Sequence, residues 1–97
     1  MSTPKDTLEQ LESAYKAKPY DTKIILALLE LVEESGDFKR VNELLKRLTE
    51  LEEDPSVRAR YFFSIGQVYE TKFNEPLDAI EYYDKCIEDD PSLLVAF

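Results

Sequence analysis

The side chains that most often carry out catalysis are nearly absent from this sequence. It contains no histidine and a single cysteine, Cys86, so imidazole-based metal ligation and Ser/His or Cys/His catalysis are excluded. Nothing basic in the helical stripe of Cys86 would lower the pKa of its thiol, and its spacing predicts a core position. No phosphate-binding loop, dinucleotide fingerprint, EF-hand spacing or glycosylation sequon appears. We therefore predict a protein that is not an enzyme, with no catalytic residue and no cofactor.

Carboxylates are the one abundant group that could do chemistry. Two acidic clusters, Glu52-Glu53-Asp54 and Glu88-Asp89-Asp90, recur at equivalent places in the chain. On one edge of a fold they could bridge a cation or a basic peptide. A capping role explains them better, because Asp54 or Asp90 can accept hydrogen bonds from the first N–H groups of the next helix. We expect no metal site, and acid/base catalysis by carboxylates alone stays open as a third interpretation of function.

Composition and charge describe one soluble domain with an acidic surface. The 97 residues are 43% hydrophobic, enough for a core, and 12 basic against 21 acidic residues give a net charge of −9. This charge disfavours nucleic acids and anionic membranes as partners, since phosphate binding needs a basic surface. The longest apolar run, 24–32, is too short to cross a bilayer, and the N-terminus lacks the plan of a signal peptide. We expect a cytoplasmic protein without a nucleic-acid or membrane partner.

Apolar residues at three- and four-residue steps predict a series of helices joined by short turns. A proline is tolerated in the first turn of a helix, so Pro4 begins the first one. Gly36 suits the left-handed position at the end of the second helix. A further helix is expected to begin at Leu93, capped by Ser92. The expected capping residues of the other helices are Thr3, Asp21, Asp37, Asp54 and Asn74.

The stretch 62–91 is similar to a tetratricopeptide repeat. It carries the family's pattern of large, small, aromatic and proline residues on two helices: Phe62, Ile65, Gly66, Tyr69, Ala79, Tyr83, Cys86 and Pro91. Pro19, Pro55 and Pro91 recur at equal intervals, two residues longer than the family's usual unit of about 34 residues. The chain therefore resembles a short tetratricopeptide array.

The resemblance implies an all-α fold in which antiparallel helical hairpins stack as a short right-handed superhelix. It would contain about five helices plus a C-terminal stub. The whole chain, 1–97, would form a single domain. Its parts would be an N-terminal capping helix over 4–18, a first repeat over 21–54, a second repeat over 56–90 and the start of a further helix over 92–97.

The resemblance also implies a function, that of a protein-interaction or scaffold module which binds on its concave face. The family's inner-face spacing selects eight candidate partner-binding residues, namely Lys23, Leu26, Glu30, Glu33, Arg60, Phe63, Gln67 and Glu70. A groove of this kind suits an extended or helical peptide with a hydrophobic anchor and a basic end. The alternative is that these charged faces are only solvated. Because Leu26, Glu30 and Ser64 stand where the family's chaperone-tail binders carry lysine, asparagine or arginine, we predict no clamp for a terminal carboxylate.

Self-assembly is the alternative function. Two hairpins and a capping helix fall short of the three repeats that usually make a stable array, and the C-terminal stub would expose apolar surface. A second copy could cover this surface and give a homodimer. The residues expected to make that contact are Leu93, Leu94 and Phe97.

Overall fold

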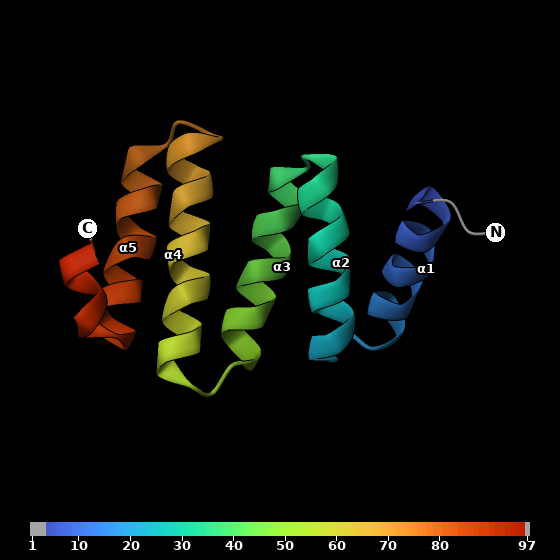
Figure 1. Cartoon of the computed structure of the whole chain (residues 1–97), viewed down its shortest axis with the longest axis horizontal. Helices are drawn as coiled ribbons and strands as arrows, with labels where there is room; N and C mark the ends of the chain where they lie inside the picture. The colour runs from blue at the N-terminus through green and yellow to red at the C-terminus, as the bar shows by residue number, and fades with distance from the viewer. Residues whose placement is uncertain (1–3, 97) are drawn as a thin grey trace. The chain divides into compact units, whose positions relative to one another are not determined.

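The computed structural model describes the backbone of residues 4–96 and the side chains of residues 7–93. Within that range every regular element is helical, with five α-helices followed by a 3-10 helix, η1 (Figure 1). The all-α prediction is therefore confirmed. The chain divides into two compact units, Met1–Leu44 and Leu45–Phe97, and each is described by itself. Their boundary falls inside α3 (Phe38–Leu51), the second helix of the predicted first repeat.

The first unit consists of α1 (Pro4–Ala17), α2 (Thr22–Ser35) and the first part of α3. α1 packs against α2. From α3, Arg40 forms an ion pair with Glu12 of α1, and its guanidinium lies 5.3 Å from the centre of the Tyr15 ring. The core of this unit is aliphatic and consists of Ile25, Leu28, Leu29, Val32, Val41 and Leu44.

Local capping explains where α2 and α3 begin and end. The carboxylate of Asp21 accepts a hydrogen bond of 3.0 Å from the backbone N–H of Lys23. Gly36 follows α2 with φ of 81°, in the left-handed region that glycine enters without strain. Asp37 accepts a hydrogen bond of 3.2 Å from the N–H of Arg40. Asp21, Gly36 and Asp37 thus have the roles that the sequence predicts for them.

The second unit consists of the end of α3, α4 (Pro55–Thr71), α5 (Pro76–Asp89) and η1 (Pro91–Ala96). α4 and α5 run antiparallel and pack side by side, and η1 packs against α5 (Figure 1). Cys86 is fully buried, which confirms its predicted place in the core. The other buried apolar residues of this unit are Leu45, Leu48, Ala59, Ile65, Val68 and Ala79.

The turn between α4 and α5 differs from the prediction. Asn74 does not cap α5, because its φ is 51°, in the left-handed region that asparagine tolerates better than most residues. α5 begins at Pro76, after Glu75, whose side chain makes no capping hydrogen bond. Asn74 thus belongs to the turn that reverses the chain and does not start the helix.

The segment after α5 also differs from the prediction. Its helix begins at Pro91 and not after Ser92, and it is a 3-10 helix. The carboxylate of Asp90 accepts hydrogen bonds from the backbone N–H and the hydroxyl of Ser92, so Asp90 is the residue that supports this turn. The predicted cap Thr3 and the predicted contact residue Phe97 lie outside the described residues, as does the side chain of Leu94.

None of the described helices is long and apolar enough to cross a bilayer.

Candidate functional site

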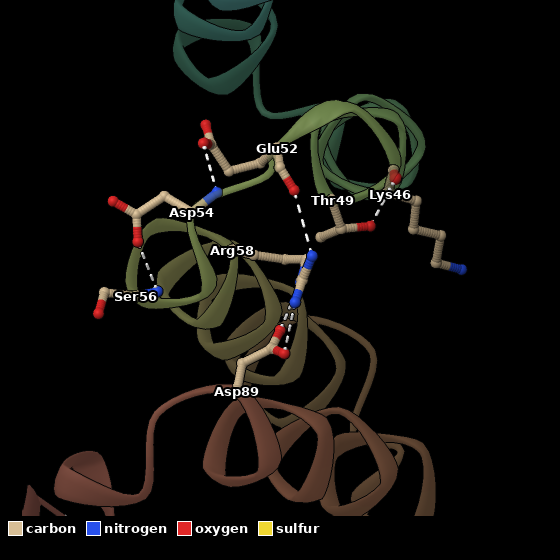
Figure 2. Close-up of polar contacts among 7 residues, drawn as sticks. All are labelled: Lys46, Thr49, Glu52, Asp54, Ser56, Arg58 and Asp89. Carbon is tan, nitrogen blue, oxygen red and sulfur yellow. Dashed lines mark hydrogen bonds and ion pairs between the residues drawn. The ribbon is translucent and has the colours of Figure 1, made fainter.

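Arg58 fixes the start of α4 relative to the end of α5. Its Nε donates a hydrogen bond of 2.7 Å to Oδ2 of Asp89, and its Nη2 donates one of 2.8 Å to Oδ1 of the same carboxylate (Figure 2). The Nη1 group donates to the backbone carbonyl of Glu52 at 3.2 Å. The hydrogen bonds from Arg58 hold the pKa of Asp89 below its ordinary value. The bidentate ion pair with Asp89 therefore joins α4 to α5, and the hydrogen bond to the Glu52 carbonyl joins both to the α3–α4 turn.

A lysine set among tyrosines holds α4, α5 and the end of α3 together. Nζ of Lys46 donates a hydrogen bond of 2.8 Å to the hydroxyl of Tyr69. It lies 5.3 Å and 5.5 Å from the ring centres of Tyr69 and Tyr82, which stack on each other at 5.5 Å. A cation over aromatic faces is attracted by their negative quadrupole. The ammonium group of Lys46 is thus held by contacts with two tyrosines of its own unit.

Gly66 lets α5 approach α4 closely. A Cβ atom placed at residue 66 would lie 2.6 Å from Cε1 of Tyr83, a distance that real contacts do not reach. The Tyr83 ring also lies 5.5 Å from the ring of Phe63, and its hydroxyl donates a 3.2 Å hydrogen bond to Glu70. Burial, together with this carboxylate, raises the pKa of the Tyr83 hydroxyl, which therefore stays a donor at neutral pH. Tyr83 is thereby fixed at three points along α4.

An open cleft lies between α4 and α5, next to the Tyr83 ring. Its volume is ≈ 500 Å³. α4 contributes residues at i, i+4 and i+7, and α5 contributes residues at i, i+3, i+4 and i+7, so that one face of each helix forms a wall. Two of the lining side chains are carboxylates and none is basic. The lining residues are Phe63, Gln67, Glu70, Ile80, Tyr83, Asp84 and Ile87.

The wall that α5 contributes continues into an exposed apolar row beside a row of carboxylates. Leu77 is 82% exposed and Ile80 is 54% exposed, far more than large apolar residues of a packed helix face. Alongside them run the exposed side chains of Glu81, Asp84 and Glu88, at i, i+3 and i+7. Within the described part of the chain none of these three forms an ion pair, whereas Asp89 on the other side of α5 is paired with Arg58. The surface is therefore both apolar and acidic.

Three of the candidate residues from the sequence meet at this cleft, and the others lie elsewhere. Phe63, Gln67 and Glu70 line it, whereas Arg60, one turn earlier on α4, is exposed and does not. The remaining four, Lys23, Leu26, Glu30 and Glu33, share one exposed face of α2 in the first unit. Leu93, expected to take part in self-association, is half-buried in η1.

Four residues of α5 line the cleft, whereas the groove expected from the sequence takes its residues from α2 and α4. Ile80, Asp84 and Ile87 were not considered as partner-binding residues, and Tyr83 was assigned only to the helix interface. A signal was present in the sequence, because Leu77, Ile80 and Ile87 form a second apolar stripe at helical spacing beside the buried stripe of Ala79 and Cys86. A helix with two apolar stripes has two surfaces to cover.

Among the described residues, the side chains that line the cleft are apolar, amide, phenolic and carboxylate groups, and none of them is a thiol or a basic group. Burial, followed by the nearby carboxylates of Asp90 and Asp89, raises the pKa of the Cys86 thiol, so this group is a poor nucleophile. Among the described residues no group of three or more carboxylate or thiol side chains could hold a metal ion. Comparison of the chain with protein-family models and with curated proteins finds no match. The geometry of the cleft therefore carries the functional argument.

Proposed function

We propose that this protein is a non-catalytic interaction module of tetratricopeptide type, which binds a peptide or protein partner in the cleft between α4 and α5. The observation that carries the proposal is the convergence of Phe63, Gln67 and Glu70 with an exposed apolar row on α5. The shape and surface of a helical array, and not reactive groups, provide recognition in such modules. A cytoplasmic location and a scaffold role belong to the same proposal.

The chemistry of the cleft defines the partner. Phe63 and Ile80 offer apolar surface for one hydrophobic anchor, and burial of an aliphatic side chain is worth roughly 1.5–3 kcal/mol. Glu70 and Asp84 flank this surface and favour lysine or arginine next to the anchor. The partner is thus a protein segment with a hydrophobic side chain and basic residues.

Selection from a displayed random-peptide library on the full chain tests this function. We expect the selected peptides to share an apolar residue with lysine or arginine beside it, and to lose at least about tenfold in affinity for Ile80→Gln. Because Ile80 is exposed and glutamine is a good helix former, this variant should fold. Leu26→Gln is the matched control on α2, where the leucine is 42% exposed.

The two variants discriminate between the two surfaces. Retention of affinity by Ile80→Gln, together with its loss in Leu26→Gln, would contradict the cleft and assign binding to the α2 face. Loss only in Ile80→Gln supports the cleft.

A further inference from the structure

The geometry points to the form in which the partner binds: we infer that the α4/α5 cleft takes an amphipathic α-helix with lysine or arginine along one flank. This inference rests on the proposed function, because it uses the same cleft. The proposed function requires contact with one hydrophobic side chain of the partner. The inference extends this contact to a row of residues along α5. Three features of the second unit carry it, namely the length of the apolar row, the line of carboxylates and the absence of backbone partners in the walls.

The apolar row is long. Leu77, Ile80 and Ile87 lie on one stripe of α5, which at 1.5 Å per residue extends over about 15 Å from the first to the last. A row of this length matches about three turns of a second helix, whose residues at i, i+3 or i+4, i+7 and i+10 or i+11 would pack along it. An isolated side chain would cover only one position of the row and would leave Leu77, 82% exposed, in water.

The carboxylates give the partner a charge pattern. Glu81, Asp84 and Glu88 run parallel to the apolar row, and within the described residues they have no cationic partner. Lysine or arginine at helical spacing on one flank of the incoming helix would face all three. Two identical α5 faces would bring these carboxylates together, so like-charge repulsion disfavours a second copy as the occupant.

The walls of the cleft favour a helix over an extended peptide. α4 and α5 are helices, so their backbone groups are already hydrogen-bonded and offer no strand edge. An extended segment would bring unpaired N–H and C=O groups against apolar side chains, and few groups could satisfy them. The hydroxyl of Tyr83 already donates to Glu70, which leaves the amide of Gln67 as the main neutral polar group of the lining. A helix satisfies its backbone internally and avoids this cost.

The experiment uses three synthetic peptides with the same number of leucine and lysine residues, each labelled for fluorescence anisotropy with the full chain. The first carries leucine at i, i+3 and i+7 with lysine on one flank, and a hydrocarbon staple holds it helical. The second keeps the leucine and lysine positions of the first, has no staple and carries proline at two other central positions. The third is stapled but scrambled, so that leucine and lysine are spread around the helix.

We expect the first peptide to bind at least about tenfold more tightly than the other two. Ile80→Gln and Asp84→Lys should each weaken it, and Glu9→Lys, an exposed charge reversal on α1, should not. Equal or tighter binding of the proline peptide, still lost in Ile80→Gln, would overturn the helical form and leave the proposed function in place. Binding that Ile80→Gln does not change, or no binding by any of the three, would overturn the inference and its cleft together. A dimer of the chain that Ile80→Gln dissociates would also overturn it, because a second copy would then occupy the surface.

Discussion

Gly66 and Tyr83 lie close together across the α4–α5 interface, and the Tyr83 ring forms part of the wall of the cleft. The Cε1 and Cδ1 atoms of the Tyr83 ring would lie 2.6 Å and 2.7 Å from a Cβ atom at residue 66. The tyrosine occupies the space that a side chain would need, and its hydroxyl reaches Glu70 one turn further along α4. The position of the Tyr83 ring in the cleft wall therefore depends on the absence of a side chain at residue 66.

Replacement of Gly66 by alanine tests this relationship. In an unconstrained helix the change would stabilise by roughly 0.5–1 kcal/mol, since glycine loses more backbone entropy on folding. Here the added methyl group must displace the Tyr83 ring, and overpacking of this kind costs about 1–3 kcal/mol. We expect Gly66→Ala to lower the urea midpoint of unfolding. In a Tyr83→Ala background the same change should become neutral or stabilising, and a stabilising effect in the wild type would refute the contact.

The ion pair of Arg58 and Asp89 predicts a pH dependence of stability. Because the pKa of Asp89 is lowered in the folded state, its contribution is present above the pKa of the unfolded chain, about 3.9, and is lost as the pH falls through the folded-state pKa. Asp89→Asn should therefore lower the urea midpoint at neutral pH. The midpoints of variant and wild type should converge in acid, where both side chains are neutral.

The control for this experiment is Glu53, an exposed carboxylate that lies just before the cap of α4. Glu53→Gln should leave the difference in urea midpoint between neutral and acid pH close to that of the wild type. A constant offset between Asp89→Asn and the wild type at every pH would show that packing, and not the ion pair, is responsible.

Asn42 is a buried polar residue with an unusual environment. Its side chain is 4% exposed, and within the described part of the chain neither its amide nitrogen nor its amide oxygen has a hydrogen-bond partner. An unsatisfied buried group of this kind costs about 1–3 kcal/mol. We expect Asn42→Leu to raise the urea midpoint and Asn42→Asp to lower it, since the latter buries a charge. A destabilising leucine would show that the amide has a partner in solution.

Self-association is the alternative function, in which a second copy covers the apolar surface expected of the C-terminal residues 93–97. It requires a dimer that forms with rising concentration and that Leu94→Glu with Phe97→Glu converts to a monomer. We expect instead a monomer across a light-scattering concentration series, because copies with a net charge of −9 and acidic α5 faces repel each other. A dimer that the double variant abolishes would favour self-assembly.

The helices and most of their caps could be predicted from the sequence because these features depend on residues close together in the chain. Asp21, Asp37 and Asp54 cap helices through N–H groups two or three residues away, and Gly36 ends α2 through its own backbone freedom. The capping role predicted for Asn74 is wrong because a helix cap and a left-handed turn use the same residue type. Local pattern alone does not distinguish them.

The α4/α5 cleft could be predicted from the sequence only in part, because it depends on how two helices are rotated against each other. The pairs Arg58–Asp89 and Lys46–Tyr69 join residues 31 and 23 positions apart, and nothing local specifies them. Phe63 and Glu70 were selected from the resemblance to a repeat family, which locates one helix face. The contribution of Ile80 and Ile87 follows from the packing of α5 on α4, which only the structure provides. The superhelical arrangement remains a prediction.

The most direct test of the cleft is an amide and methyl NMR titration of the isotope-labelled full chain with the stapled basic amphipathic peptide. We expect the largest chemical-shift changes at Phe63, Ile80 and Ile87, with smaller ones along the carboxylate row of α5. Changes confined to the α2 face around Leu26 and Glu30 would contradict the account.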